Sequence, residues 1–261
     1  MAPTFVGAGN AVYGSSDSWP SSLLIGSGDV PSGVVNGDRL ILFVSVYYQQ
    51  DLFPSVDDSL GSFDGLSTWT TIPKAQFLVT GTSSNTFWQL WAYTVRYSDA
   101  LFPLTISPLG TTSGTAYTPS QRTLGDNYRA QLFAWSPSHA AGGSGTGSAS
   151  AQGATLPSAG ASATLTNADG IVVAAAAMPN AGAINAFSTA RSFTEQYHQT
   201  AISNRGGSLK VADYAPGSAA TYTGPQWSKQ TGTNLSGVAL TIAFNDPDPS
   251  LNEWGVGQVR W

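Results

Sequence analysis

The stretch that decides the fold is Gly37-Asp38-Arg39-Leu40-Ile41-Leu42-Phe43-Val44-Ser45-Val46-Tyr47-Tyr48. Gly37-Asp38 provides the residues of a tight turn, and the apolar tract from Leu40 to Val44 follows at once. An unbroken apolar run of this length, bounded by turn residues, predicts a strand that is covered on both faces. We therefore expect this stretch to be an inner strand of an all-β domain.

Three further runs are predicted to form the other layers of the same sandwich: Phe87–Tyr97, Tyr128–Trp135 and Ile171–Met178. In the first, large residues alternate with Thr94 and Arg96, which predicts a partly exposed face. The third contains consecutive alanines, which favour a helix, but it begins with Ile-Val-Val and ends after eight residues at a proline. A buried strand packed against bulky aromatic residues fits this run better.

Shorter segments complete the pattern. Asp169-Gly170 lies between Ala161–Thr166 and Ile171–Met178, so these two runs are predicted to pair as a hairpin. Pro73 predicts that Trp69–Val79 is divided into two short strands, and Thr194–Gln199 fits either a strand or a single helical turn. In all, about ten strands separated by turn signals predict an antiparallel β-sandwich of jelly-roll type.

The domain organisation rests on composition. A chain of 261 residues can form one large β domain or two smaller ones. We assign residues 1–245 to the sandwich, and the Gly, Ser and Ala tract at 140–153 is either a linker between subdomains or an exposed hairpin loop. Two Asp-Pro pairs predict that residues 246–261 leave the sandwich as an extended arm. The arm carries apolar anchors for a neighbouring subunit or for the sandwich itself: Trp254, Val256, Val259 and Trp261.

Charged residues make up only 10% of the chain, against roughly 25% in an ordinary soluble domain. Such a surface gains little solubility from charge repulsion, so packing against copies of itself or against partners is expected. The net charge is -5 and no Lys/Arg cluster occurs, which argues against nucleic acid and against a membrane surface as partners. No apolar stretch is long enough to insert into a bilayer and no secretory signal is visible, so synthesis in a cytoplasm is expected.

The chain is poor in residues that carry chemistry. It has no cysteine and no Gly-x-Ser-x-Gly elbow. Its two histidines, His139 and His198, have no carboxylates at ligand spacing, so we interpret them as surface residues. Glu195 and Glu253 are the only glutamates, which gives little support to a paired-carboxylate hydrolase. We therefore expect no enzymatic activity, no cofactor and no metal site.

Four aspartates gather in the polar stretch from Gln49 to Gly65, which we interpret as a long exposed loop: Asp51, Asp57, Asp58 and Asp64. Their spacing does not match the twelve-residue calcium loop, so a solvated acidic loop that makes contacts is preferred over a calcium site.

Aromatic residues are the most abundant special feature, with eight Trp, ten Tyr and eleven Phe. Planar side chains that line a groove stack on sugar rings, which makes a carbohydrate-binding module the alternative function. Trp88, Trp91 and Trp135 lie in predicted strands, however, where packing in the core is the simpler explanation.

The sequence resembles bacteriophage virion proteins, in particular the minor tail and decoration proteins of phages that infect actinobacteria. The features that carry the resemblance are the Met1–Gly9 opening, Gly37–Val44, a Gly/Trp element at Gly65–Thr71, Leu90–Tyr93, Gln131–Trp135 and Asp169–Ala174. The resemblance implies a β-sandwich without enzymatic activity that assembles into a virion with other virion proteins and with copies of itself. A host cell-surface glycan is a further partner that such a protein would meet. The arm at 246–261 is not part of the family pattern.

Overall fold

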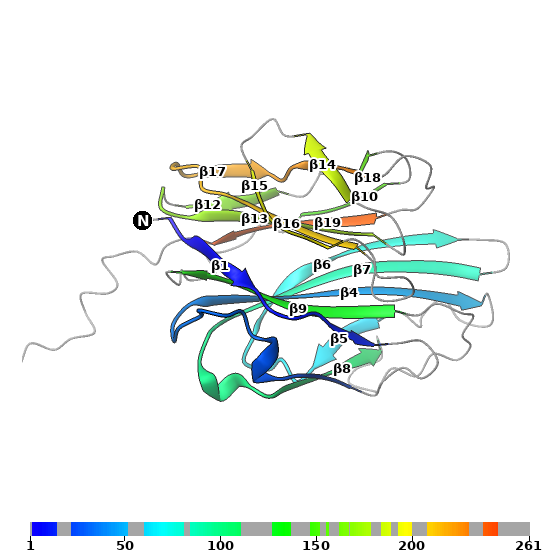
Figure 1. The fold of residues 1–261 in the computed structure, drawn as a ribbon. Coiled ribbons are helices and arrows are strands. Elements are labelled where there is room, and N and C mark those ends of the chain that lie inside the picture. The colour runs from blue at the N-terminus through cyan, green and yellow to red at the C-terminus, as the bar shows by residue number, and fades with distance from the viewer. Residues whose placement is uncertain are drawn as a thin grey trace, which may run out of the picture.

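The computed structural model describes residues 2–14, 22–51, 60–80, 84–110, 127–136, 147–151, 155–156, 162–166, 168–178, 184–188, 193–199, 208–229 and 237–244. These ranges contain nineteen strands and two 3-10 helices, Ser27–Asp29 and Asp99–Leu101 (Figure 1). All strand pairs are antiparallel, so the predicted all-β, antiparallel sandwich is confirmed.

The first large sheet is centred on the stretch that decides the fold. Its order is β1-β9-β4-β7-β6, and β2 also pairs with β9. The strands are β1 (Thr4–Ala8), β2 (Val12–Gly14), β4 (Arg39–Asp51), β6 (Thr70–Thr80), β7 (Ser84–Arg96) and β9 (Asn127–Ser136). The predicted strands 87–97 and 128–135 therefore flank β4 in one sheet and do not form separate layers. At the start of β4, Gly37 has a φ of 97°, and the Asp38 N–H donates to the Val35 carbonyl at 3.0 Å, which closes the predicted turn.

The second large sheet has the order β10-β19-β13-β16-β15. Its strands are β10 (Gly147–Ala151), β13 (Ile171–Met178), β15 (Thr194–Gln199), β16 (Ser208–Tyr214) and β19 (Gly237–Phe244). The alanine-rich run is a strand, as predicted, and the segment 194–199 is a strand too. Part of the tract at 140–153 is also a strand, because β10 pairs with β19.

The predicted hairpin across Asp169-Gly170 is wrong. The strand β12 (Ser162–Leu165) pairs with β17 (Ala220–Thr223), whereas β13 pairs with β16 and β19. A Cβ on Gly170 would lie 2.7 Å from the Phe244 carbonyl oxygen and 2.5 Å from the Leu165 side chain. Gly170 thus carries the chain from one layer to the next through a gap too narrow for a side chain.

Smaller sheets cover the outer faces of the two large ones (Figure 1). The sheet β3-β8-β5 covers the first, and β12-β17 together with β11-β18-β14 covers the second. The strands not yet given are β3 (Leu23–Ile25), β5 (Leu60–Asp64), β8 (Leu104–Gly110), β11 (Thr155–Leu156), β14 (Ile184–Ser188) and β18 (Gln226–Lys229).

The two halves of the chain repeat one topology. Apart from β2, which has no counterpart in the second sheet, each large sheet has five strands, and when these are numbered in chain order within their own half, both sheets have the order 1-5-2-4-3. The covering layer repeats as well. In the first half, β8 pairs with β3 and with β5. In the second half, β17 and β18 take the place of β8 and pair with β12 and β14. The molecule is therefore a tandem of two sandwiches that share a central interface, and residues 137–146 join them.

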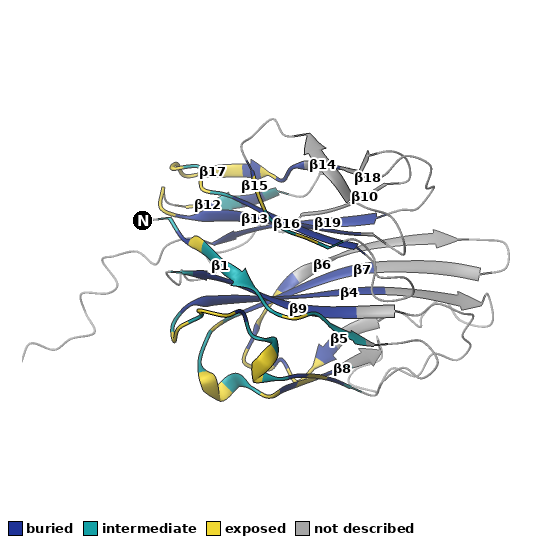
Figure 2. Ribbon diagram, viewed as in Figure 1, coloured by how far each residue is buried: buried dark blue, intermediate teal, exposed yellow. Residues whose placement is uncertain are grey.

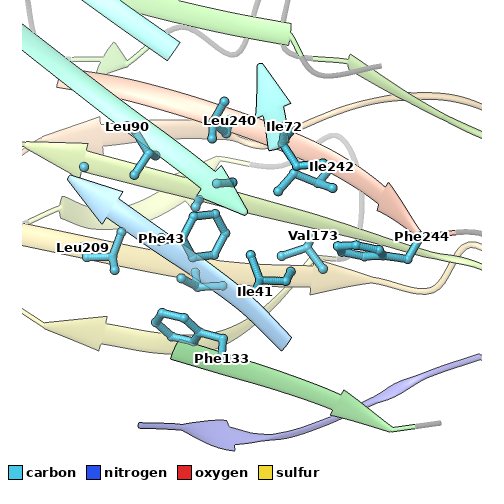
Figure 3. Packing of buried hydrophobic residues seen from close by; sticks show 14 of the residues in the cluster. Ile41, Phe43, Ile72, Leu90, Phe133, Val173, Leu209, Leu240, Ile242 and Phe244 are labelled. Atoms are coloured by element: carbon cyan, nitrogen blue, oxygen red, sulfur yellow. The ribbon is translucent and has the colours of Figure 1, made fainter. Parts of the chain in front are cut away.

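Three hydrophobic cores lie between the four layers, and the strand period distributes side chains among them. In β4, Leu40, Leu42, Val44 and Val46 face the core of the first half, whereas Ile41 and Phe43 face the central core between the large sheets. Figure 3 shows side chains of both large sheets pointing toward one another in the central core. The inner strands are buried along most of their described length (Figure 2), so the prediction that β4 is covered on both faces is confirmed.

Small residues in β13 allow bulky neighbours on both of its faces. Ala175 and Ala177 lie in the central core with Phe43 and Phe133, and Ala174 and Ala176 face the core of the second half. Ala175→Leu is expected to lower the free energy of unfolding by about 1–3 kcal/mol, because a close-packed core has no room for added carbon atoms. Urea denaturation measures the change, with the exposed Ala219→Leu as control. Equal stability of the two variants would contradict close packing at Ala175.

The strand β6 is longer than predicted. Residues 70–80 form one strand, and the interruption at Pro73 is absorbed by an irregularity in the pairing with β7 between Ile72 and Ala75. A proline lacks the N–H of a ladder bond, so a bulge at an edge strand accommodates it without ending the strand.

Candidate functional site

A pocket of about 460 Å³ lies at the junction of the two halves. Pro3, Thr4 and Phe5 line it from the first half, at the start of β1. From the second half, Ile171, Thr194, Gln196 and residues 213–215 contribute. The pocket therefore lies where an edge of each large sheet meets the other.

Asp213 is the charged residue of the pocket wall, and only 7% of its surface is exposed. Its Oδ2 accepts a hydrogen bond from Trp135 Nε1 at 2.9 Å, and its Oδ1 accepts one from Gln196 Nε2 at 2.9 Å. Burial raises the pKa of Asp213, while these two hydrogen bonds act in the opposite direction. Both donors are neutral groups, and their two hydrogen bonds fix the orientation of the Asp213 carboxylate.

Trp135 connects this carboxylate to the first half. Its indole is 1% exposed and packs on Phe5, with ring centroids 5.2 Å apart. Phe5 is the cross-strand neighbour of Trp135 in the β1–β9 pair and also lines the pocket. Phe5 in the pocket wall thus rests on Trp135, and the hydrogen bond from Trp135 to Asp213 joins the two large sheets beside the pocket.

A second polar cluster crosses the same junction. Arg129 is 1% exposed and donates to Tyr197 Oη at 2.9 Å and to Gln199 Oε1 at 2.7 Å. The rings of Tyr13 and Tyr197 lie 5.8 and 5.7 Å from its guanidinium carbon. Burial lowers the pKa of Arg129, and the two tyrosines oppose this change.

Arg129 also donates to the Gln131 side chain, whose amide donates to the Gly9 carbonyl at 2.8 Å. Within the described ranges, Nε and one terminal nitrogen of Arg129 have no hydrogen-bond partner. Its contacts with Tyr197 and Gln199 join strands of the two halves, so we interpret the cluster as a structural link between the large sheets.

A third polar group lies on the other face of β15 and β16. Lys210 Nζ is 2.7 Å from Glu195 Oε2, and His198 Nδ1 is 4.0 Å from Glu195 Oε1. Burial lowers the pKa of His198, Lys210 lowers it further, and Glu195 opposes both. His198 is exposed, as predicted, and among the described residues no group of three His, Cys, Asp or Glu side chains can hold a metal ion.

The structure describes two of the four aspartates of the predicted acidic loop, and these two lie at the ends of different strands. Asp51 is the last residue of β4 and pairs with Ser84, so it does not lie in a loop. Asp64 ends β5 and is exposed, and its Oδ1 accepts a hydrogen bond from the Gly65 N–H at 2.8 Å. The predicted loop of residues 49–65 is therefore wrong at both ends, and Asp57 and Asp58 lie outside the described residues.

The predicted arm also lies outside the described residues, with its anchors Trp254, Val256, Val259 and Trp261, and so does His139. Trp91 and Trp135 are buried, which confirms their assignment to the core. The pocket itself was not predicted, since no local pattern marks Asp213, which lies 78 positions from Trp135.

Comparison of the chain with protein-family models, curated proteins and solved structures finds no match. Within the residues that the structure describes, no helix is long and apolar enough to cross a membrane.

Proposed function

We propose that the chain is a non-enzymatic structural protein of a bacteriophage virion, made in the host cytoplasm and placed on the particle surface as a minor tail or capsid decoration protein. The observation that carries the proposal is a charged fraction of only 10% on an all-β scaffold. A weakly charged surface suits a protein that is fixed in an assembly and does not depend on charge repulsion to stay apart from its neighbours.

The packing supports the same role. Each large sheet is covered on both faces, and the chain contains no cysteine, so its stability comes from apolar layers and strand ladders. Such a scaffold leaves loops and termini available for contacts with the tail or capsid and with copies of the chain. The sequence resemblance to phage tail and decoration proteins points in the same direction.

Deletion of residues 246–261 tests the proposal. The apolar anchors of this segment are proposed to hold the protein on a neighbouring subunit, so the truncated protein is expected to be absent from purified particles while the sandwich still folds. Mass spectrometry of particles measures incorporation, and circular dichroism of the purified protein checks folding. A matched control replaces the polar residues Asn252 and Gln258 of the same segment by serine, keeps the four apolar anchors, and is expected to leave incorporation unchanged.

Two results would count against these ideas. Normal incorporation of the truncated protein would contradict the role of the arm. Absence of the full-length protein from purified particles would contradict the virion proposal itself.

Carbohydrate binding is a second candidate, either alone or as host attachment within the virion role. It is favoured by one observation, the pocket at the junction, which combines a buried carboxylate, neutral polar side chains and an aromatic ring. A few fixed polar groups beside an apolar surface are common in sites that bind a small polar ligand.

A further inference from the structure

We infer that the pocket between β1, β15 and β16 binds a neutral pyranose sugar, with the Asp213 carboxylate accepting hydrogen bonds from ring hydroxyls and Phe5 facing an apolar side of the ring. The inference rests on the second candidate function and specifies its site and ligand class. The pocket volume of about 460 Å³ lies within the range of small-molecule sites, roughly 300–1,000 Å³.

The Asp213 carboxylate has acceptor positions left for the hydroxyl groups of a ligand. An ionised carboxylate has about four acceptor positions, and Trp135 and Gln196 occupy one on each oxygen. No basic residue is among the residues that line the pocket, and the described residues provide no ion pair for Asp213. The remaining acceptor positions therefore suit hydroxyl groups, and a fixed acceptor binds them without an ordering cost.

Neutral polar groups surround the carboxylate. Thr4 donates its hydroxyl to the Ser136 carbonyl at 3.1 Å, which fixes the position of its oxygen as an acceptor. Gln196 uses its amide N–H for Asp213, so its amide oxygen points away from that bond and can accept from a ligand. Thr194, on the same wall, is exposed.

Phe5 provides the apolar surface. The Tyr214 ring packs against Phe193 and Tyr222, at 5.4 and 5.9 Å, on the opposite side of the second large sheet. The Phe5 ring packs on Trp135 at the pocket and remains partly exposed. Aromatic rings bind the C–H faces of sugars through apolar contact, whereas the carboxylate disfavours acidic sugars by repulsion.

The test is direct binding of monosaccharides to the purified full chain by saturation-transfer NMR and calorimetry. The probes are glucose, galactose and mannose as neutral sugars, N-acetylneuraminic acid as an acidic one, and glucosamine as a cationic one. We expect at least one neutral hexose to bind and the acidic sugar to fail. Asp213→Asn is expected to weaken binding roughly tenfold, since it removes the charge from a hydrogen-bonded acceptor.

A second variant leaves the buried contacts of Asp213 intact. Thr194→Trp fills the pocket from an exposed position and is expected to abolish binding, whereas Thr223→Trp, an exposed threonine on β17, is expected to leave it unchanged. Thermal unfolding checks that all variants fold.

Three results would overturn the inference. The first is that no neutral hexose binds at millimolar concentration. The second is that glucosamine is the only sugar that binds and that Asp213→Asn abolishes its binding. The third is that a neutral hexose still binds to the Thr194→Trp variant. None of them bears on incorporation into particles, which tests the virion proposal separately.

Discussion

Replacing Trp135 by alanine is expected to lower the free energy of unfolding by about 3–5 kcal/mol, the usual cost of deleting a large aromatic side chain from a core. The indole is 1% exposed and belongs to the central core, where it lies against Phe5 and Phe133. Its removal leaves a cavity and takes one hydrogen-bond donor from the buried carboxylate of Asp213. Urea denaturation followed by fluorescence of the remaining tryptophans measures the loss.

Trp135→Phe separates the two contributions. This variant keeps most of the apolar packing and removes the indole N–H, so a loss of about 1–3 kcal/mol is expected, which is the cost of depriving a buried acceptor of its partner. If alanine and phenylalanine cost the same, the hydrogen bond would account for the whole effect and the cavity argument would be wrong. A loss below about 1 kcal/mol for alanine would contradict the central position of Trp135.

Gly65→Ala is expected to lower the free energy of unfolding by about 2–4 kcal/mol, from strain of about 1–2 kcal/mol and the displacement of a packed strand. Gly65 has a φ of 84°, in the left-handed region. A Cβ there would lie 1.9 Å from the Thr105 carbonyl oxygen, which belongs to the backbone of β8. The clash can be relieved only if the β5 end and β8 move apart, which opens the first core.

Gly37→Ala is the matched control. Gly37 also has a positive φ, 97°, but a Cβ added there would meet no atom within 4 Å beyond its chain neighbours. Only the conformational strain applies, so a loss of about 1–2 kcal/mol is expected. Differential scanning calorimetry of both variants compares them, and equal losses would show that the approach of Thr105 to Gly65 has no energetic consequence.

Strand identity could be predicted from the sequence because it is a local property. The turn at Gly37-Asp38, the alternation before Tyr97 and the Ile-Val-Val start of β13 each identify a strand without reference to the rest of the chain. Burial on both faces was also evident for Leu40–Val44, since continuous apolar runs occur where neither face meets water.

Strand pairing could not be predicted in the same way. The turn residues Asp169-Gly170 suggested a hairpin, yet the structure uses them to cross from β12 to a different layer, because the partners of β13 lie far away in the sequence. The pocket depends on such distant contacts, since Phe5, Trp135 and Asp213 come from three strands and two halves. A weak signal of the repeat was present in the turn residues that precede both β4 and β13.

Because its two halves share one topology, the chain resembles a dimer of two similar domains that are joined in one polypeptide. Neither half can hide the inner face of its large sheet alone, because residues such as Phe43 and Phe133 are covered by Val173 and Leu240 of the other half. Two copies that exchanged halves would form the same core contacts, because each half presents the same face in either arrangement. The need to cover these inner faces is therefore what holds two such halves together, within one chain or between two.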